Sequence, residues 1–136
     1  MNTRTLKLMA LALVAVHFMV VVLHSISHTV LSVNASPAQL AFIIPVIIVA
    51  PVLAGIMLPK FERAGTILLT ASMLGSLIFG IYYHFIADTI DHVAHVAFLQ
   101  PVFWSQMFQL TSSLLALSEM LGTGLGLLLL LRSQRH

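Results

Sequence analysis

Four long apolar stretches constrain the fold of this chain more than any other feature of its sequence. They cover approximately residues 6–33, 37–58, 64–87 and 102–131. A helix needs roughly 20 mostly apolar residues to cross a bilayer, and each stretch reaches that length. Because backbone polar groups inside lipid must be hydrogen-bonded within the protein, we predict an all-α membrane protein. The expected architecture is a single domain over residues 1–136, built as a four-transmembrane-helix bundle.

The first stretch also resembles a secretory signal, since basic residues precede it. Its apolar run is much longer than the core of such a signal, which has about 7 to 15 residues. We therefore interpret it as a membrane span.

The basic residues predict how the spans are oriented. They precede the first span, separate the second from the third and follow the fourth, at Arg4, Lys7, Lys60, Arg63, Arg132 and Arg135. The positive-inside rule then places both termini in the cytoplasm. The connections on the other side, the turn of residues 34–38 and the link of residues 88–101, contain no Lys or Arg. We expect an integral protein of a bacterial inner membrane, whose acidic and histidine-rich side faces the periplasm or outside.

Composition excludes several kinds of chemistry. The chain has 7 histidines and no cysteine, which excludes disulfides, thiolate metal ligands and thiol redox reactions. Its net charge of +2 does not indicate nucleic-acid binding, because the basic residues lie at the ends of the spans, where topology explains them.

Two prolines predict an irregular second span. Ser36 followed by Pro37 is a typical helix start, with a capping hydroxyl before a proline at the first helical position. Pro45 and Pro51 then each remove a backbone donor inside the span. We expect a kinked helix without ionisable side chains, which serves as scaffold.

Three histidines form a narrow stripe on the first predicted helix. At about 100° per residue, His17, His24 and His28 lie at roughly 0°, −20° and +20° around the helix axis. A histidine facing lipid would bury its nitrogens without partners. We therefore expect the stripe to face the interior of the bundle.

A second group of polar residues lies at and beyond the end of the third span. If the helix continues past the membrane, Asp88, Asp91, His92 and His95 lie at roughly 40°, −20°, 80° and 20° relative to His84. These five candidate ligands would then share one face of the helix.

The two groups are expected to meet near the outer surface. The first span runs outward and ends near residue 33, and the third also runs outward and ends near residue 87, so His24, His28 and His84 should lie at similar depth. Imidazole and carboxylate groups on facing helices are typical ligands for Zn, Fe, Cu or Mn. We predict a metal site built from some or all of His24, His28, His84, Asp88, Asp91, His92 and His95.

One acidic residue lies near the middle of the fourth span. Charged carboxylates are costly in lipid and usually functional there, which singles out Glu119. His17 is expected at comparable depth, so the two side chains are candidate catalytic residues that pair as a proton relay.

The sequence leaves several functions open. The first hypothesis is an integral membrane metal-binding protein, with or without activity as a metal-dependent redox enzyme. The second is an electron-transfer protein that uses quinone, with haem b held by one histidine from each of two helices. A proton or ion pathway through His17 and Glu119, or an accessory subunit of a larger membrane complex, are further alternatives. The expected surroundings are the lipid bilayer, with quinone or another membrane subunit as candidate partners.

Overall fold

The computed structural model describes residues 2–133, which form helices and no β-strand. In chain order the helices are α1 (Thr3–Val30), α2 (Pro37–Phe42), the π-helix η1 (Ile43–Val49), α3 (Ala50–Met57), α4 (Glu62–Ile81), the π-helix η2 (Tyr82–Ile86), α5 (Val93–Val96) and α6 (Val102–Ser133). Four helical units are long and apolar enough to cross a membrane: α1, α2–η1–α3, α4–η2 and α6. The predicted all-helical chain with four candidate spans is thus confirmed. Arg135 lies outside the described residues.

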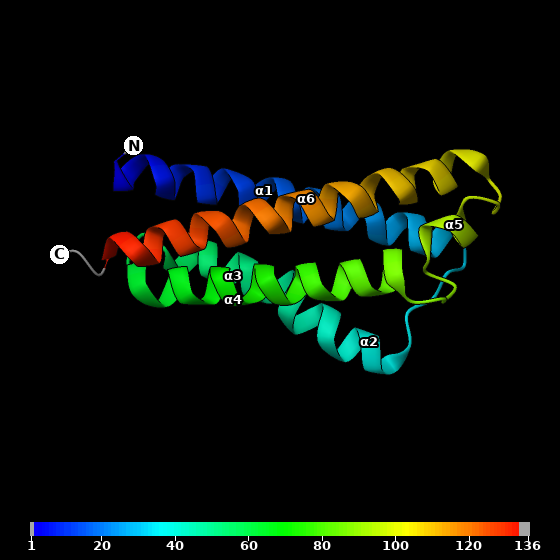
Figure 1. Ribbon diagram of the computed structural model, residues 1–136, viewed down its shortest axis with the longest axis horizontal. Helices are drawn as coiled ribbons and strands as arrows, with labels where there is room; N and C mark the ends of the chain where they lie inside the picture. Colours follow the sequence, from blue (N-terminus) through cyan, green and yellow to red (C-terminus); the bar gives the residue numbers. More distant parts are fainter. Residues whose placement is uncertain (1, 134–136) are drawn as a thin grey trace.

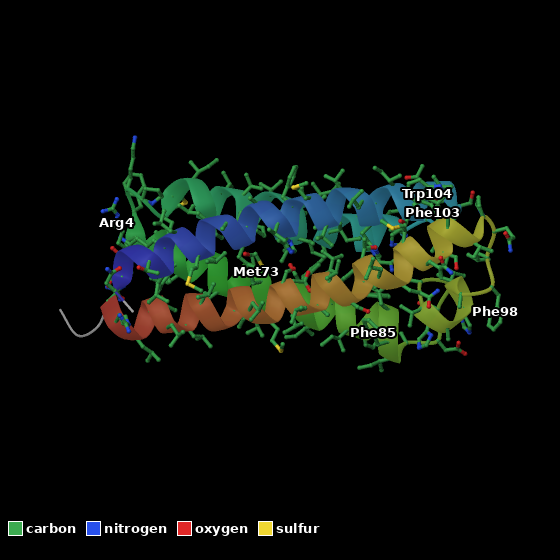
Figure 2. All side chains as sticks on the ribbon, turned by 90° about the horizontal axis from the view of Figure 1, so that it is seen from above. Arg4, Met73, Phe85, Phe98, Phe103 and Trp104 are labelled. Carbon is green, nitrogen blue, oxygen red and sulfur yellow. The ribbon has the colours of Figure 1, made fainter. Side chains whose placement is uncertain are left out.

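The helices run along a common axis, with α6 packed against both α1 and α4. Helix α3 packs mainly on α4, and the beginning of α1 lies at the same end of the bundle as the end of α6 (Figure 1). Most outward-facing side chains along the bundle are apolar. Arg4 lies at one end, whereas Phe98 and Trp104 lie at the other (Figure 2). We call these the terminal end and the distal end.

Local capping explains where the second helical unit begins. The Ser36 hydroxyl accepts a hydrogen bond from the Gln39 backbone N–H, and the Gln39 side chain accepts one from the Ser36 backbone N–H. This capping box satisfies two donors that would otherwise be unpaired at the helix start. Pro37 occupies the first turn, where its missing N–H costs nothing.

The second unit is irregular around its prolines, as its sequence predicts. Pro45 lies inside η1, where π-helical hydrogen bonding replaces the α-helical pattern, and Pro51 lies in the first turn of α3. Figure 1 shows α2 turning away from the line of α3. The unit therefore packs closely at the terminal end and diverges from its neighbours at the distal end.

The two ends of the bundle are filled differently. The terminal half holds the largest apolar core cluster, which consists of Leu6, Ala10, Val14, Ala54, Leu58, Leu69, Met73 and Leu129. Glycines allow close helix contacts there: a Cβ added to Gly122 would lie 2.8 Å from Met73 Cγ. Buried histidines and a cavity lie toward the distal end. The candidate site described below lies in that half.

Candidate metal centre

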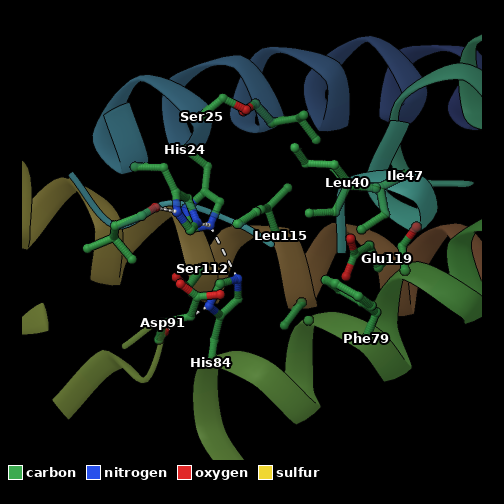
Figure 3. A pocket seen from close by; sticks show the side chains of 18 of the residues that line it. His24, Ser25, Leu40, Ile47, Phe79, His84, Asp91, Ser112, Leu115 and Glu119 are labelled. Atoms are coloured by element: carbon green, nitrogen blue, oxygen red, sulfur yellow. Dashed lines mark hydrogen bonds between the residues drawn. The ribbon is translucent and has the colours of Figure 1, made fainter. Parts of the chain in front are cut away.

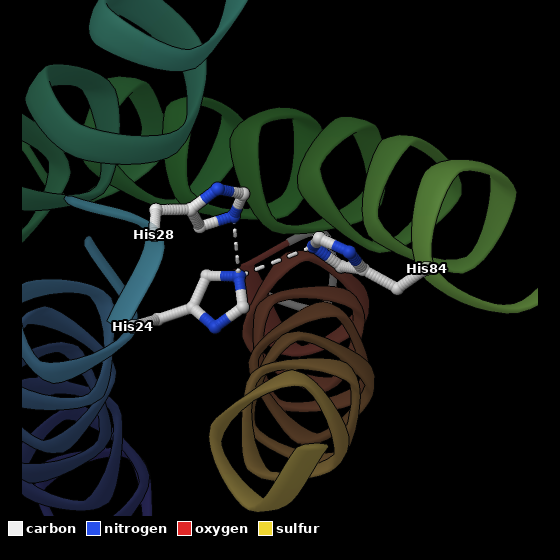
Figure 4. Close-up of side chains that lie close together, drawn as sticks. All are labelled: His24, His28 and His84. Atoms are coloured by element: carbon white, nitrogen blue, oxygen red, sulfur yellow. Dashed lines mark hydrogen bonds between the residues drawn. The ribbon is translucent and has the colours of Figure 1, made fainter. Parts of the chain in front are cut away.

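Three histidine side chains from two helices converge at the distal end. His24 and His28 lie one turn apart on α1, and His84 lies on η2. The Nε2 atom of His24 is 3.2 Å from Nε2 of His28 and 3.2 Å from Nε2 of His84. Figure 4 shows the three rings pointing toward a common point. One nitrogen from each ring lies within 4.8 Å of the other two, a group able to hold a metal ion. We call it the histidine triad.

The outer nitrogens of two rings are bound to backbone carbonyls. His28 Nδ1 lies 2.6 Å from the carbonyl oxygen of Val33, and His84 Nδ1 lies 3.0 Å from that of Asp91. A carbonyl oxygen only accepts hydrogen bonds, so each Nδ1 carries the hydrogen and donates it. In the neutral rings, the Nε2 atoms of His28 and His84 therefore present lone pairs.

The outer nitrogen of His24 is hydrogen-bonded to a hydroxyl whose own hydrogen is donated to another acceptor. His24 Nδ1 lies 2.9 Å from Thr111 Oγ1, and this oxygen donates to backbone carbonyls of its own helix, 2.6 Å away at Met107 and 3.1 Å away at Phe108. Thr111 thus accepts from His24 Nδ1, which leaves a lone pair on His24 Nε2 as well. Three lone pairs converge with no hydrogen between them, an arrangement that a cation would stabilise.

The spacing of these nitrogens fits coordination to a small metal ion. Metal–nitrogen bonds of 2.0–2.1 Å at a tetrahedral angle place two ligand nitrogens roughly 3.3 Å apart. Two of the three separations in the triad are 3.2 Å. The hydrogen bonds from each Nδ1 are the kind of outer contact that fixes the tautomer and orientation of metal-binding histidines.

An aromatic side chain supports the triad from α6. Phe108 is fully buried, and its ring centroid lies 4.7 Å from that of His24, 4.8 Å from that of His28 and 5.3 Å from that of His84. The rigid ring restricts the rotation of all three imidazoles. Preorganised ligands lower the entropic cost of binding an ion.

Asp91 lies next to the histidine triad, but its carboxylate is not part of the converging group of His24, His28 and His84. Its backbone carbonyl holds His84, and its carboxylate accepts a hydrogen bond from Gln39 Nε2 at 3.1 Å. Gln39 also belongs to the capping box of α2. Asp91 therefore joins the start of the second helical unit to the segment that orients His84.

Three of the predicted ligands lie elsewhere, because the third helix does not continue as expected. It ends at Ile86, and Ala87 is extended. Asp88 and His95 form an exposed pair 3.2 Å apart, while His92 Nδ1 accepts from a backbone N–H to cap α5. The interpretation of residues 84–95 as one helical face is thus wrong. Asp, Thr and Ile residues disfavour a helix in this segment.

The predicted pairing of His17 with Glu119 is also absent. His17 Nε2 lies 3.2 Å from the Ile47 carbonyl oxygen, and Nδ1 lies 3.2 Å from Ser118 Oγ. In an α-helix the Ile47 carbonyl would bind the N–H of residue 51, which is a proline and has none. His17 supplies the missing donor. Because Glu119 follows Ser118, it is rotated by about 100° and faces another part of the bundle.

Glu119 lies on the wall of a cavity that begins at the triad. The cavity has a volume of about 290 Å³, and its wall includes all three triad histidines, Asp91 and Glu119. Figure 3 shows His24 and His84 toward one end and Glu119 toward the other, with Leu115 between them. Glu119 is 2% exposed, and its Oε2 atom has no hydrogen-bond partner.

Several residues that build this site could not be picked out from the sequence. Thr111 and Phe108 lie on α6, and Gln39 lies on α2. Polar and aromatic residues are common at such positions in membrane helices. Their only sequence signal is that Thr111 begins a run of three hydroxyl residues, 111–113, within an apolar helix.

No family model, curated protein or solved structure matches this chain. Its function must therefore be inferred from the geometry of the site.

Proposed function

We propose that this chain is an integral membrane protein that binds a transition-metal ion through His24, His28 and His84. The observation that carries the proposal is the convergence of three imidazole lone pairs on one point, each fixed by a hydrogen bond on the far side of its ring. Three neutral imidazoles at this spacing suit Zn, Fe or Cu.

The spacing favours a bare ion over haem. Two axial imidazoles on opposite faces of a haem must be separated by roughly twice the metal–nitrogen bond of about 2.0–2.1 Å. The adjacent Nε2 atoms of the triad are only 3.2 Å apart. A third imidazole at the same point would also occupy the space of the macrocycle.

The cavity suggests that the ion takes part in chemistry. Catalytic metal sites have three protein ligands and keep a further coordination position open. Here three histidines supply nitrogens, and the same side chains line the cavity. We infer that a water molecule or a substrate atom from the cavity completes the coordination, as in a metal-dependent redox enzyme.

The basic residues support an orientation for this protein. Arg4, Lys60 and Arg63 lie on the connections and ends remote from the triad. The positive-inside rule then places both termini in the cytoplasm. The metal centre would lie near the periplasmic or outer surface of the membrane.

The proposal is tested by metal analysis of the detergent-purified protein before and after chelation and reloading with Zn²⁺, Fe²⁺ or Cu²⁺. We expect one ion per chain, with binding that weakens as the pH is lowered. The reason is that protons and metal compete for the same three nitrogen atoms. If none of these ions binds stoichiometrically at neutral pH, the proposal is wrong.

Removing the hydroxyl behind His24 should weaken the metal centre without destroying it. Thr111→Val keeps the shape of the side chain but cannot accept the hydrogen bond from His24 Nδ1. Loss of an outer-shell partner typically costs about 10- to 100-fold in metal affinity. Competition titration with a coloured chelator measures this change, and Ser113→Ala on the same helix is the control, because Ser113 bonds only to its own helix. Equal affinities for Thr111→Val and the wild type would show that the hydroxyl does not orient His24.

A further inference from the structure

Three buried oxygen atoms without hydrogen-bond partners lie on residues that share one cavity. Within residues 2–133 these atoms are Ser76 Oγ, Asp91 Oδ1 and Glu119 Oε2. All three residues line the cavity that begins at the histidine triad. A buried polar group without a partner costs about 1–3 kcal/mol. Their gathering at one cavity indicates a site for a polar ligand.

The chemistry of these atoms specifies the kind of group that would bind them. A carboxylate oxygen only accepts hydrogen bonds, and a serine hydroxyl both donates and accepts. An ionised Asp91 thus calls for a donor, and Glu119 can accept from a donor in either protonation state. A ligand with hydroxyl groups would satisfy them, whereas a ligand with only acceptor oxygens would not.

Most of the remaining cavity wall is apolar. Val21, Leu40, Ile43, Phe79 and Leu115 separate the polar positions. The volume of about 290 Å³ is at the small end of the range for ligand pockets, roughly 300–1,000 Å³. The cavity therefore fits a single ring with polar groups at its edges, and any longer apolar tail must extend outside.

Glu119 and the triad lie toward opposite ends of the cavity (Figure 3). A Cβ added to Gly80 would lie 3.6 Å from Glu119 Oε2, which places the carboxylate beside Gly80. Gly80 precedes His84 by four residues, so the carboxylate lies beside α4 about one helical turn before His84. A ring with two hydroxyls in para positions could thus approach Glu119 with one and the triad with the other.

The cavity reaches the outer side of α1, where lipid would lie. Val21, Ser25 and Thr29 line both the cavity and a shallow groove on the outer face of α1. This groove continues to Ile48 on η1 and is otherwise apolar apart from the two hydroxyls. A ligand could thus pass between α1 and the second helical unit while its tail remained in the bilayer.

We propose that the cavity binds the ring of a lipid-soluble para-hydroquinone. Glu119 accepts a hydrogen bond from one hydroxyl, and the other hydroxyl points toward the metal centre. The proposal rests on the proposed metal centre for the role of the second hydroxyl. The contact with Glu119 does not depend on the metal.

The test compares two probes that share the same ring and tail, one with hydrogen-bond donors and one whose hydroxyls are methylated. Decyl-hydroquinone and its dimethyl ether are titrated calorimetrically, without oxygen, into protein in lipid nanodiscs. We expect the hydroquinone to bind the wild type roughly tenfold more tightly, because leaving the buried Glu119 oxygen unpaired carries a penalty of that size. Glu119→Leu should remove this preference while the metal content stays unchanged.

A second variant tests the location of the ring. Gly80→Val fills the space next to Glu119 and should weaken both probes, whereas Gly124→Ala adds a methyl group where no atom lies within 4 Å and should change neither. Equal binding of the two probes to the wild type, a preference that survives in Glu119→Leu, or no binding at all would overturn the proposal. The last result would favour a water-filled proton pathway.

Measuring the same affinities after chelation separates this proposal from the metal proposal. A preference for the hydroquinone that depends on Glu119 in protein that never binds metal would support the ligand site and refute the metal centre. Stoichiometric metal binding without any preference for the hydroquinone would support the metal centre and refute the ligand site.

Discussion

Replacing His84 with alanine is expected to abolish stoichiometric metal binding. The substitution removes one of three converging nitrogens and also frees the Asp91 carbonyl that its ring holds. Loss of an outer-shell partner alone costs up to about 100-fold in affinity, so the loss of a ligand should cost more. Metal per chain after dialysis, measured by elemental analysis, should fall from one toward zero.

His95→Ala is the matched control for this experiment. His95 follows η2 in the sequence and is also a histidine, but it lies at the surface beside Asp88, outside the triad. Its substitution should leave the metal content unchanged. Retention of metal by His84→Ala together with loss by His95→Ala would place the site in the segment of residues 88–95 and contradict the geometry described above.

Replacing Gly65 with alanine is expected to cause the largest loss of stability among the glycine substitutions. A Cβ at this position would lie 2.8 Å from the backbone nitrogen of Leu58 and 2.9 Å from its Cα atom. Backbone atoms cannot rotate away, so α3 and α4 would have to separate. Overpacking of this kind costs about 1–3 kcal/mol.

Gly124→Ala provides the comparison, because its new methyl group meets no atom within 4 Å. Alanine is favoured over glycine in a helix by about 1 kcal/mol, so this variant should be as stable as the wild type or more so. Thermal unfolding of both variants in the same detergent measures the difference. Equal melting temperatures would show that the contact between α3 and α4 relaxes without cost.

The fold was largely predictable because it follows from local properties of the chain. Length and apolarity predict the four helical units, and Pro45 predicts the irregular hydrogen bonding of η1. The prediction was wrong beyond Ile86, because it assumed helical periodicity in a segment that is not a continuation of the helix. There the side chain of Thr89 binds the carbonyl of Tyr83, and that of His92 binds a later backbone N–H. Such competing contacts are invisible to a periodicity argument.

The candidate site was predictable only in part. The stripe on α1 and the matching depth of η2 brought His24, His28 and His84 together as expected from the sequence. His17 lies on the same stripe but binds a carbonyl that a proline leaves unpaired, and Glu119 turns toward the cavity instead. Both outcomes depend on which neighbouring helix each side chain faces. The angular position of a residue on its own helix does not specify that neighbour.

The sequence by itself determined that the chain is apolar enough for a membrane and that it forms four long helices. It also determined that three histidines are able to face one another. Each of these follows from residue type and helical period, which act within one segment. Only the three-dimensional structure decided which nitrogens carry hydrogen, because that depends on how the segments after α1 and η2 fold back to place the carbonyls of Val33 and Asp91, and on a hydroxyl from α6 at Thr111. Packing also decided that Glu119 borders a cavity, since a cavity exists only where several helices fail to fill the space between them.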